Sequence, residues 1–232
     1  MKLVVFDIDG TLLDNLAAED ECFVQALRDG LGLNAVSPEW ETYQHVSDHG
    51  IAIETYRREF GAAPLPDAVA DTIGRFVALL AAAYHSQPIS PIPGAGELLA
   101  SLPSHGWAIA MATGAWRRAA HFKLTAAGLR DDAIPLATSE DGPARTDIVK
   151  AAVARAERHY DASTVSSRWA TACGTWMPPE HSRSRLWESR LVRAPSAFVP
   201  RGRRVCCPIS RAASPYWRRS RWQRFPRHHR AR

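Results

Sequence analysis

The stretch VVFDIDGTLLD, residues 4–14, decides how the rest of the chain is interpreted. It overlaps KLVVFD, residues 2–7, whose short apolar run rich in valine is typical of a buried parallel strand. Asp7 and Asp9 follow this run, and Gly10 permits a tight turn after them. Open α/β sheets bind ligands at the carboxyl ends of their strands, so both acids stand where a ligand would bind.

Two carboxylates two residues apart can divide the work of phosphoryl transfer. Asp7 can attack phosphorus and form an aspartyl-phosphate. Asp9 can protonate the leaving oxygen and then take a proton from the water that resolves the intermediate. The alternative is an ordinary strand followed by an acidic turn. The longer pattern, in which an apolar run leads into DIDGT, favours catalysis.

Helix and strand patterns organise the chain up to about residue 161. A first strand is followed by an all-helical segment and then by alternating helices and strands, which implies a parallel sheet with right-handed crossovers. We therefore predict an α/β fold with a Rossmann-like parallel-sheet core, residues 1–14 and 89–161, and a helical cap, residues 15–88. The predicted helices lie at 16–33, 38–60, 66–86, 97–102, 116–129 and 147–159, and the further strands at 107–113 and 134–138.

Charge and periodicity change beyond residue 161. Residues 163–232 hold 16 Arg, no Lys and 2 acids, a charge of +14, whereas residues 1–162 hold 13 basic and 22 acidic residues, a charge of −9. Pro, Arg, Ser and Trp interrupt every regular pattern there. We predict that residues 162–232 form an irregular, disordered tail. The sheet would then end after its third strand and leave an apolar edge uncovered beside Asp7.

Residues 1 to about 160 resemble the haloacid dehalogenase (HAD) superfamily. The opening DIDGT resembles the family's first signature, and AMATG at 110–114 resembles its second, a strand that ends in a hydroxyl residue. The family's third element is a cation placed before a helix. Arg145 is the best match for this cation, and Lys150 is the alternative.

The resemblance implies a set of site residues. Asp7 would be the nucleophile and Asp9 the acid and base, and both would help to hold Mg²⁺. Thr113, Gly114 and Arg145 would bind the phosphate. A second Asp in the first signature goes with phosphatases and phosphomutases in this family, whereas dehalogenases lack it.

The activity implied is that of a Mg²⁺-dependent phosphatase that hydrolyses a small phosphorylated metabolite, with a phosphomutase as the alternative. A helical cap would close over such a substrate. Asp48 and His49, in the segment VSDHGIAIE, are candidates for its specificity. The alternative is that Asp48 only caps the start of a helix.

A membrane location, secretion and a nucleic-acid partner are less favoured. The chain has no run of eighteen apolar residues and does not open with the pattern of a secretory signal, so we expect a cytoplasmic protein without a membrane span. An inactive protein with a basic nucleic-acid-binding tail is the alternative to an enzyme. Because the tail lacks Lys and any recognisable binding fold, we expect non-specific nucleic-acid binding at most.

The family's fourth element is missing from the sequence as it stands. That element is an apolar strand followed by acids that hold Mg²⁺, and residues 163–179 contain no carboxylate. A reading frame shifted by one base can supply it. Each shifted codon takes the last base of one residue's codon and the first two bases of the next. Trp169–Ala170 then encodes Gly and Trp176–Met177 encodes Asp without any choice of bases, and Ala170–Thr171 permits Asp. We hypothesise a frameshift near residues 160–163, which would also explain the composition of the tail.

The hypothesis predicts the bases of the gene at these codons. Overlapping codons such as those of Ala170–Thr171 and Gly174–Thr175, which have the form NAC, should read GAC and so encode Asp. Sequencing the gene across residues 160–180 tests this. Overlaps that read CAC, AAC or TAC would remove the hidden acids at these positions, and the hypothesis with them.

Overall fold

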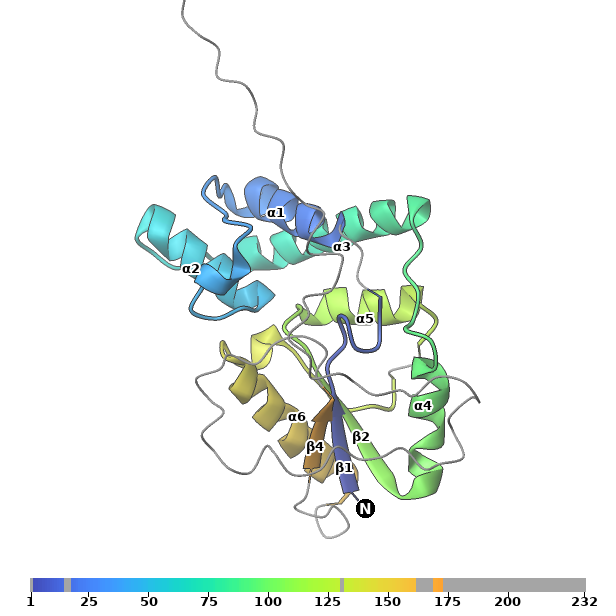
Figure 1. Ribbon diagram of the computed structural model, residues 1–232. Coiled ribbons are helices and arrows are strands. Elements are labelled where there is room, and N and C mark those ends of the chain that lie inside the picture. The colour runs from blue at the N-terminus through green and yellow to red at the C-terminus, as the bar shows by residue number, and fades with distance from the viewer. Residues whose placement is uncertain (1, 15–17, 130–131, 162–168, 173–232) are drawn as a thin grey trace, which may run out of the picture. The chain divides into compact units, whose positions relative to one another are not determined.

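A computed structural model gives the fold and describes residues 2–14, 18–129, 132–161 and 169–172 (Figure 1). A parallel sheet forms its centre, with the strand order β3-β2-β1-β4. The strands are β1 (Lys2–Phe6), β2 (Trp107–Ala112), β3 (Leu136–Ala137) and β4 (Trp169–Ala172). Crossover helices join the first three strands, so the α/β class predicted from the sequence is confirmed.

Both faces of the sheet are covered. Leu3 and Val5 belong to a small apolar cluster under helix α6 (Arg145–His159), and Val4 and Phe6 belong to the larger cluster on the other side. This alternation follows from the two-residue repeat of a strand. Helices α4 (Ala95–Ser101) and α5 (Arg117–Ala126) contribute to the larger cluster, and Figure 1 shows α4 and α6 on opposite sides of β1.

An all-helical segment, here called the helical insert, separates β1 from α4. It contains α1 (Ala18–Leu31), the 3₁₀ turn η1 (Trp40–Thr42), α2 (Asp48–Phe60) and α3 (Pro66–Ser86). β1 runs toward these helices, so the insert stands at the carboxyl end of the sheet (Figure 1).

The helix predicted over residues 38–60 begins only at Asp48, so its predicted start is wrong. Ser47 has an extended backbone, and its hydroxyl accepts a hydrogen bond of 3.3 Å from the N–H of Gly50. Ser and Thr side chains offer the backbone such local bonds at helix starts, which explains why the regular pattern before Ser47 did not become helix.

The prediction that the sheet ends after three strands is also wrong. β4 pairs in parallel with β1, with Trp169 opposite Leu3 and Ala172 opposite Phe6. This is the place at which the family resemblance puts the strand of the fourth element. A free strand edge offers backbone N–H and C=O groups that any residue except proline can complete, so pairing does not require an apolar pattern. The remaining tail prediction, for 162–168 and 173–232, lies outside the described residues.

Helices α1 and α3 approach each other closely at Gly30. A Cβ atom on Gly30 would lie 2.2 Å from Oγ1 and 2.9 Å from Cα of Thr72. Gly74, also in α3, has room for a side chain, because the nearest atom to its Cβ would be Nη1 of Arg118 at 3.5 Å. The missing side chain of Gly30 therefore sets the distance between the two helices, and that of Gly74 does not.

We predict opposite effects for two glycine substitutions. Gly30→Ala should lower the free energy of unfolding by about 1–3 kcal/mol, because the added methyl group forces the two helices apart. Gly74→Ala should raise it by about 0.4–1 kcal/mol, because it only restricts the unfolded chain. Urea denaturation of both variants measures these values. A stabilised Gly30→Ala variant would contradict the close approach of the helices.

Candidate active site

Asp7 lies directly after β1, where the sheet ends. Its side chain is buried, with Asp7 8 % exposed overall. Oδ1 accepts a hydrogen bond of 3.0 Å from the N–H of Ile8, and Oδ2 lies 3.1 Å from Nη2 of Arg145. Burial raises the pKa of the Asp7 carboxyl above its usual value, and the positive charge of Arg145 acts against this shift.

Arg145 reaches Asp7 from the first turn of α6, past the loop after β2. A Cβ atom on Gly114 would lie 2.9 Å from Nη1 of Arg145 and 3.4 Å from the carbonyl oxygen of Val46. The absence of a side chain at Gly114 therefore leaves the guanidinium group its path to the carboxylate.

Lys150, the alternative cation, lies elsewhere on the same helix. Its side chain is 78 % exposed, and Nζ pairs with Oδ1 of Asp147 at 3.3 Å. Of the two cations left open by the sequence, Arg145 is therefore the one that the fold brings to Asp7.

Asp9 is held by two side chains of the core. Thr113, fully buried at the end of β2, has its Oγ1 3.5 Å from Oδ2 of Asp9 and accepts a hydrogen bond of 3.1 Å from the N–H of Ala115. The ammonium group of Lys123 donates to the other oxygen, Oδ1, and forms an ion pair with it. The carboxylate that the sequence suggests as acid and base thus has one hydroxyl and one cation beside it.

Lys123 is a site residue that the motifs did not reveal. It is only 3 % exposed, and its ammonium group contacts Asp9 and lies 3.2 Å from Oε2 of Glu19. Tyr84 donates a hydrogen bond of 2.8 Å to the other oxygen of Glu19. Burial alone would lower the pKa of Lys123, but the negative charges of Asp9 and Glu19 raise it above its ordinary value.

A sequence signal for Lys123 exists in the pattern of α5. The buried residues of this helix are Ala119, Ala120, Lys123 and Leu124. A lysine on an otherwise apolar face needs an acidic partner, because lysine is almost never fully buried unpaired. The pattern indicates a partner but does not name it, since Glu19 lies 104 residues earlier in the chain.

Asp48 joins the helical insert to the core. Its N–H donates a hydrogen bond of 2.8 Å to the carbonyl oxygen of Gly114, and its Oδ2 accepts one of 2.9 Å from the N–H of Trp116. Ser47 is the N-cap of α2, so the alternative that Asp48 caps this helix is wrong. Burial raises the pKa of Asp48 to about 7, with Lys123 and the Trp116 N–H acting against the shift.

His49 follows on the same turn of α2. Its Nδ1 is buried and has no hydrogen-bond partner among the residues that the structure describes. Burial lowers the pKa of the His49 imidazole, while the charge of Glu140 opposes this shift. His49 thus has a buried ring nitrogen without a hydrogen-bond partner among the described residues, next in the chain to Asp48.

A comparison with known protein families identifies the family of this chain. A family described as haloacid dehalogenase-like hydrolase matches residues 1–162. The chain belongs to this family. A search of curated proteins finds no match.

Solved structures show the same fold. A hydrolase from Pseudomonas syringae is similar at 21 % identity, with a TM-score of 0.50, over 67 % of this chain and 70 % of that one. CbbY from Rhodobacter sphaeroides in complex with phosphate is similar at 21 % identity, with a TM-score of 0.43, over 73 % and 76 %. At this identity the likeness to the Pseudomonas syringae hydrolase concerns the fold alone.

The Mg²⁺ ion that the HAD resemblance implies does not fit the described residues. Asp7 and Asp9 each pair with a side-chain cation, and no group of three His, Cys, Asp or Glu lies together in the described part of the chain. The position between Asp9 and Glu19, where two carboxylates converge, is filled by the Lys123 ammonium. Mg²⁺ requires near-octahedral oxygen ligands, and this set does not supply them.

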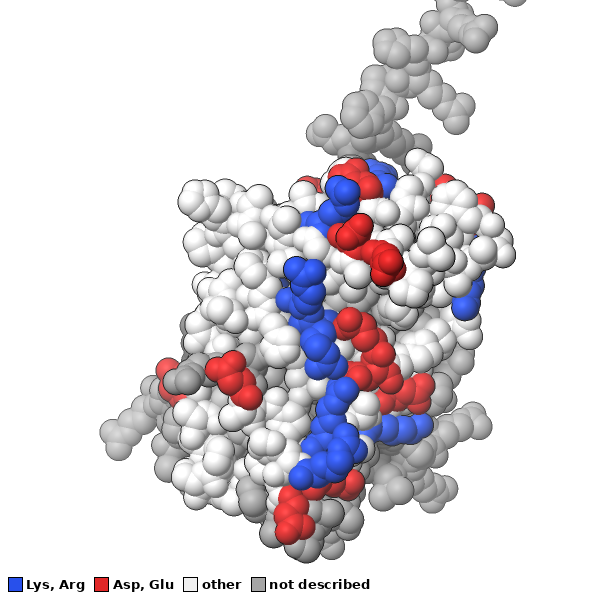
Figure 2. All heavy atoms as spheres, turned by 180° about the vertical axis from the view of Figure 1, so that it is seen from behind, with Lys and Arg blue, Asp and Glu red and all other residues white. Residues whose placement is uncertain are grey.

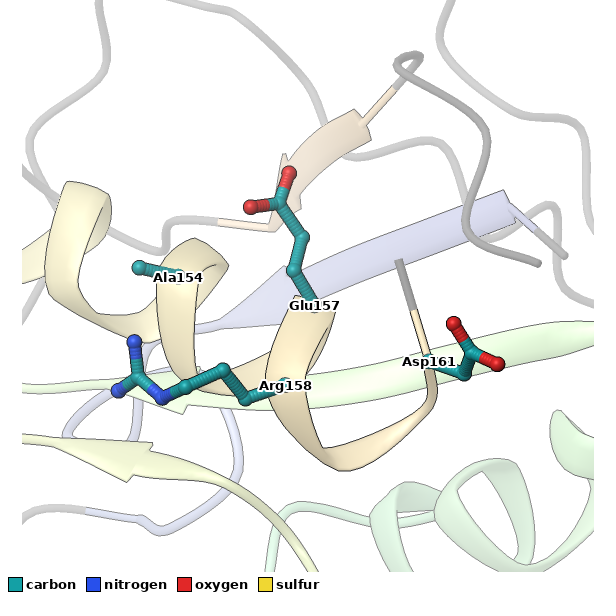
Figure 3. A pocket seen from close by; sticks show the side chains of 4 residues that line it. All are labelled: Ala154, Glu157, Arg158 and Asp161. Carbon is teal, nitrogen blue, oxygen red and sulfur yellow. The ribbon is translucent and has the colours of Figure 1, made fainter. Parts of the chain in front are cut away.

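A surface hollow at the other end of α6 is separate from this site (Figure 3). It is lined by Ala154, Glu157, Arg158 and Asp161. Glu157 lies roughly 18 Å along the helix from Arg145, given about 1.5 Å of rise per residue. Figure 3 shows the three charged side chains pointing in different directions, so they do not converge on one ligand.

We predict that Asp48 makes stability fall with rising pH. Its folded-state pKa of about 7 lies above the ordinary 3.8, so the folded chain holds a proton that the unfolded chain releases. The stabilisation is complete below about pH 4 and is lost as the pH rises to about 7. Asp48→Asn keeps an acceptor oxygen for Trp116 and should remove this slope, on the order of 1 kcal/mol after allowing for the partial exposure of the side chain.

Urea denaturation between pH 4 and pH 8 measures the slope. Asp71→Asn, at an exposed position on α3, is the matched control and should follow the wild type. Curves of equal slope for the wild type and Asp48→Asn would contradict the prediction.

Proposed function

We propose that the chain binds and hydrolyses a small phosphomonoester through an aspartyl-phosphate at Asp7. The observation that carries this is the meeting of Asp7, Asp9, Thr113 and Arg145 at the carboxyl end of the sheet. A guanidinium group next to a carboxylate, with a hydroxyl nearby, offers a phosphoryl group both a nucleophile and charge-assisted hydrogen bonds. Membership of a hydrolase family supports the same reaction class.

Each residue has a role in the proposed reaction. Asp7 attacks phosphorus while the bond to the ester oxygen breaks, and Asp9 gives that oxygen a proton, so the alcohol leaves. Water then attacks the phosphorus of the aspartyl-phosphate, and Asp9 takes the proton of the water. Phosphate leaves and Asp7 is restored. Arg145, Thr113 and the backbone of Gly114 hold the phosphoryl oxygens throughout.

The helical insert is proposed to limit the substrate to a small molecule. It is bonded to the core through Asp48, close to the loop that carries Thr113 and Gly114. We propose that Asp48 fixes this approach and that the free Nδ1 of His49 contacts the leaving group. A phosphorylated metabolite with a hydroxyl group near the phosphate would contact the core through the phosphate and the helical insert through the hydroxyl group.

Turnover at the rate of a complete Mg²⁺-dependent phosphatase is not expected of this chain. Mg²⁺ would screen the phosphate charge in a complete site. Residues 163–179 contain no carboxylate, and the described residues do not complete a site for the metal. We propose that the phosphate-binding half of the site works and that catalysis is impaired. Phosphate binding without turnover is the second candidate function, favoured by the same missing acids.

The charge pattern on the described surface favours a small substrate over a polyanion such as nucleic acid. Figure 2 shows Lys and Arg side chains in a narrow column flanked by Asp and Glu on the face seen there. This face therefore offers no broad basic patch of the kind that attracts nucleic acid. Among the described residues, no helix has the length and apolar character needed to cross a membrane. We propose a cytoplasmic enzyme with no membrane partner and with non-specific nucleic-acid binding at most.

We predict that Asp7→Asn abolishes phosphate release from p-nitrophenyl phosphate, because the variant has no nucleophile. Arg145→Met should raise the KM, or the Kd for inorganic phosphate, at least about tenfold, since a hydrogen bond to a charged group contributes roughly 1.5–3 kcal/mol. Lys150→Met is the matched control and should change neither value, because this side chain is exposed and paired with Asp147.

Calorimetric titration with phosphate and a phosphate-release assay make both measurements. Equal losses in Arg145→Met and Lys150→Met would contradict the proposed phosphate site. Phosphoryl transfer to a sugar phosphate rather than to water would indicate a phosphomutase. Phosphate binding without release from any ester would leave the second candidate function.

A further inference from the structure

We infer that Lys123 is a built-in counter-ion that lets this site bind phosphate without a divalent cation. The inference rests on the phosphate site proposed above. It adds that two side chains of the chain itself, Lys123 and Arg145, supply the positive charge that a metal ion would otherwise supply. It follows from the mismatch between the described residues and Mg²⁺.

The charges around the site make a cation at this position necessary. Asp7, Asp9 and Glu19 are three acids, and a phosphate dianion would add two further negative charges beside the first two. Among the described residues, the ion pair of Arg145 is with Asp7. Without Lys123, Asp9 and Glu19 would stand unbalanced next to the dianion and repel it.

Lys123 is fixed in place rather than free to turn away. Its side chain is 4 % exposed and lies between Asp9 and Glu19. Tyr84 holds the other oxygen of Glu19, which keeps that carboxylate directed at the ammonium group. A buried ammonium group stays charged only while acids pair with it, so Lys123 is a permanent part of the site.

Lys123 and a divalent cation would compete for the same carboxylate. A metal ion bound to Asp9 would stand within a few ångströms of the ammonium group, and like charges at this distance in a partly buried site repel strongly. The wild type should therefore gain little from Mg²⁺. Removal of the Lys123 charge leaves Asp9 and Glu19 without a cation, and these two carboxylates do not complete a Mg²⁺ site, so phosphate binding should weaken with or without Mg²⁺.

The first test is calorimetric titration of the full chain with inorganic phosphate, in EDTA and then in millimolar Mg²⁺. We expect the two dissociation constants of the wild type to agree within about threefold, less than the tenfold that corresponds to 1.4 kcal/mol. Lys123→Met should lose at least about tenfold in both buffers, because Asp9 and Glu19 alone do not complete a Mg²⁺ site. Lys150→Met is the exposed control and should behave as the wild type.

Glu19→Gln separates the charge role from a merely structural one. If Lys123 only held the fold together, loss of its partner Glu19 would weaken phosphate binding as Lys123→Met does. As a counter-ion, Lys123 is freed by Glu19→Gln to balance Asp9 and the dianion, so binding should stay equal or tighten. Lys123→Arg, which keeps the charge, should retain metal-free binding. Circular dichroism checks that each variant is folded.

The outcomes separate this inference from the proposed function. Wild-type phosphate binding that needs Mg²⁺, or weaker binding in Glu19→Gln, overturns the inference. Metal-free binding without hydrolysis of any ester overturns the catalytic proposal and supports the inference. Absence of phosphate binding in both buffers overturns both. If Lys123→Met does not fold, the wild type and Glu19→Gln still decide the question.

Discussion

The ion pair between Asp7 and Arg145 is the contact on which the rest of the site depends. A carboxylate as deeply buried as Asp7 is costly unless a cation and hydrogen bonds compensate it. Arg145 provides this compensation because α6 packs on the sheet through Ile148, Ala152 and Ala156, which share a cluster with alternate residues of β1 and β2. The packing that covers one face of the sheet therefore also places the cation at the end of β1.

The loop before α6 is held by a second polar network. The carboxylate of Asp141 accepts hydrogen bonds from Arg117 of α5 and Arg155 of α6, and it also accepts the N–H of Thr138 at 2.8 Å. These guanidinium groups also bond to the carbonyl oxygen of Leu136 in β3. Hydrogen bonds from helices α5 and α6 hold this loop in place, so Arg145 at the start of α6 has a fixed position. A side chain that binds phosphate in a defined geometry requires such a fixed position.

The sequence predicts the parts of the site that depend on local patterns. An apolar run followed by DIDGT places Asp7 and Asp9 at a strand end, and a strand ending in Thr113 places that hydroxyl beside them, since parallel strands end at one edge of the sheet. The contacts of Lys123 could not be predicted, because Lys123 and Glu19 lie in helices and not at strand ends, and a buried lysine does not identify its partner. The start of α2 was missed because a single hydroxyl, that of Ser47, decides it.

Strand β4 shows a second reason why sequence patterns do not predict the whole fold. β4 forms in a stretch with no regular apolar alternation, next to the backbone edge of β1. What places this strand is the free edge and not its own composition, because the ladder is made by backbone groups. A strand at this place does not bring the acids of the fourth element with it, since residues 163–179 have none. The fold can thus be completed at β1 while the metal site is not.

The helical insert contributes charge to the site as well as cover. Glu19 of α1, which accepts a hydrogen bond from Tyr84 of α3, pairs with Lys123 of the core, and Lys123 in turn pairs with Asp9. Movement of the insert away from the core would therefore take one acid from Lys123 and leave its charge to Asp9 alone. The position of the insert and the electrostatic surroundings of Asp9 are therefore coupled through one ammonium group.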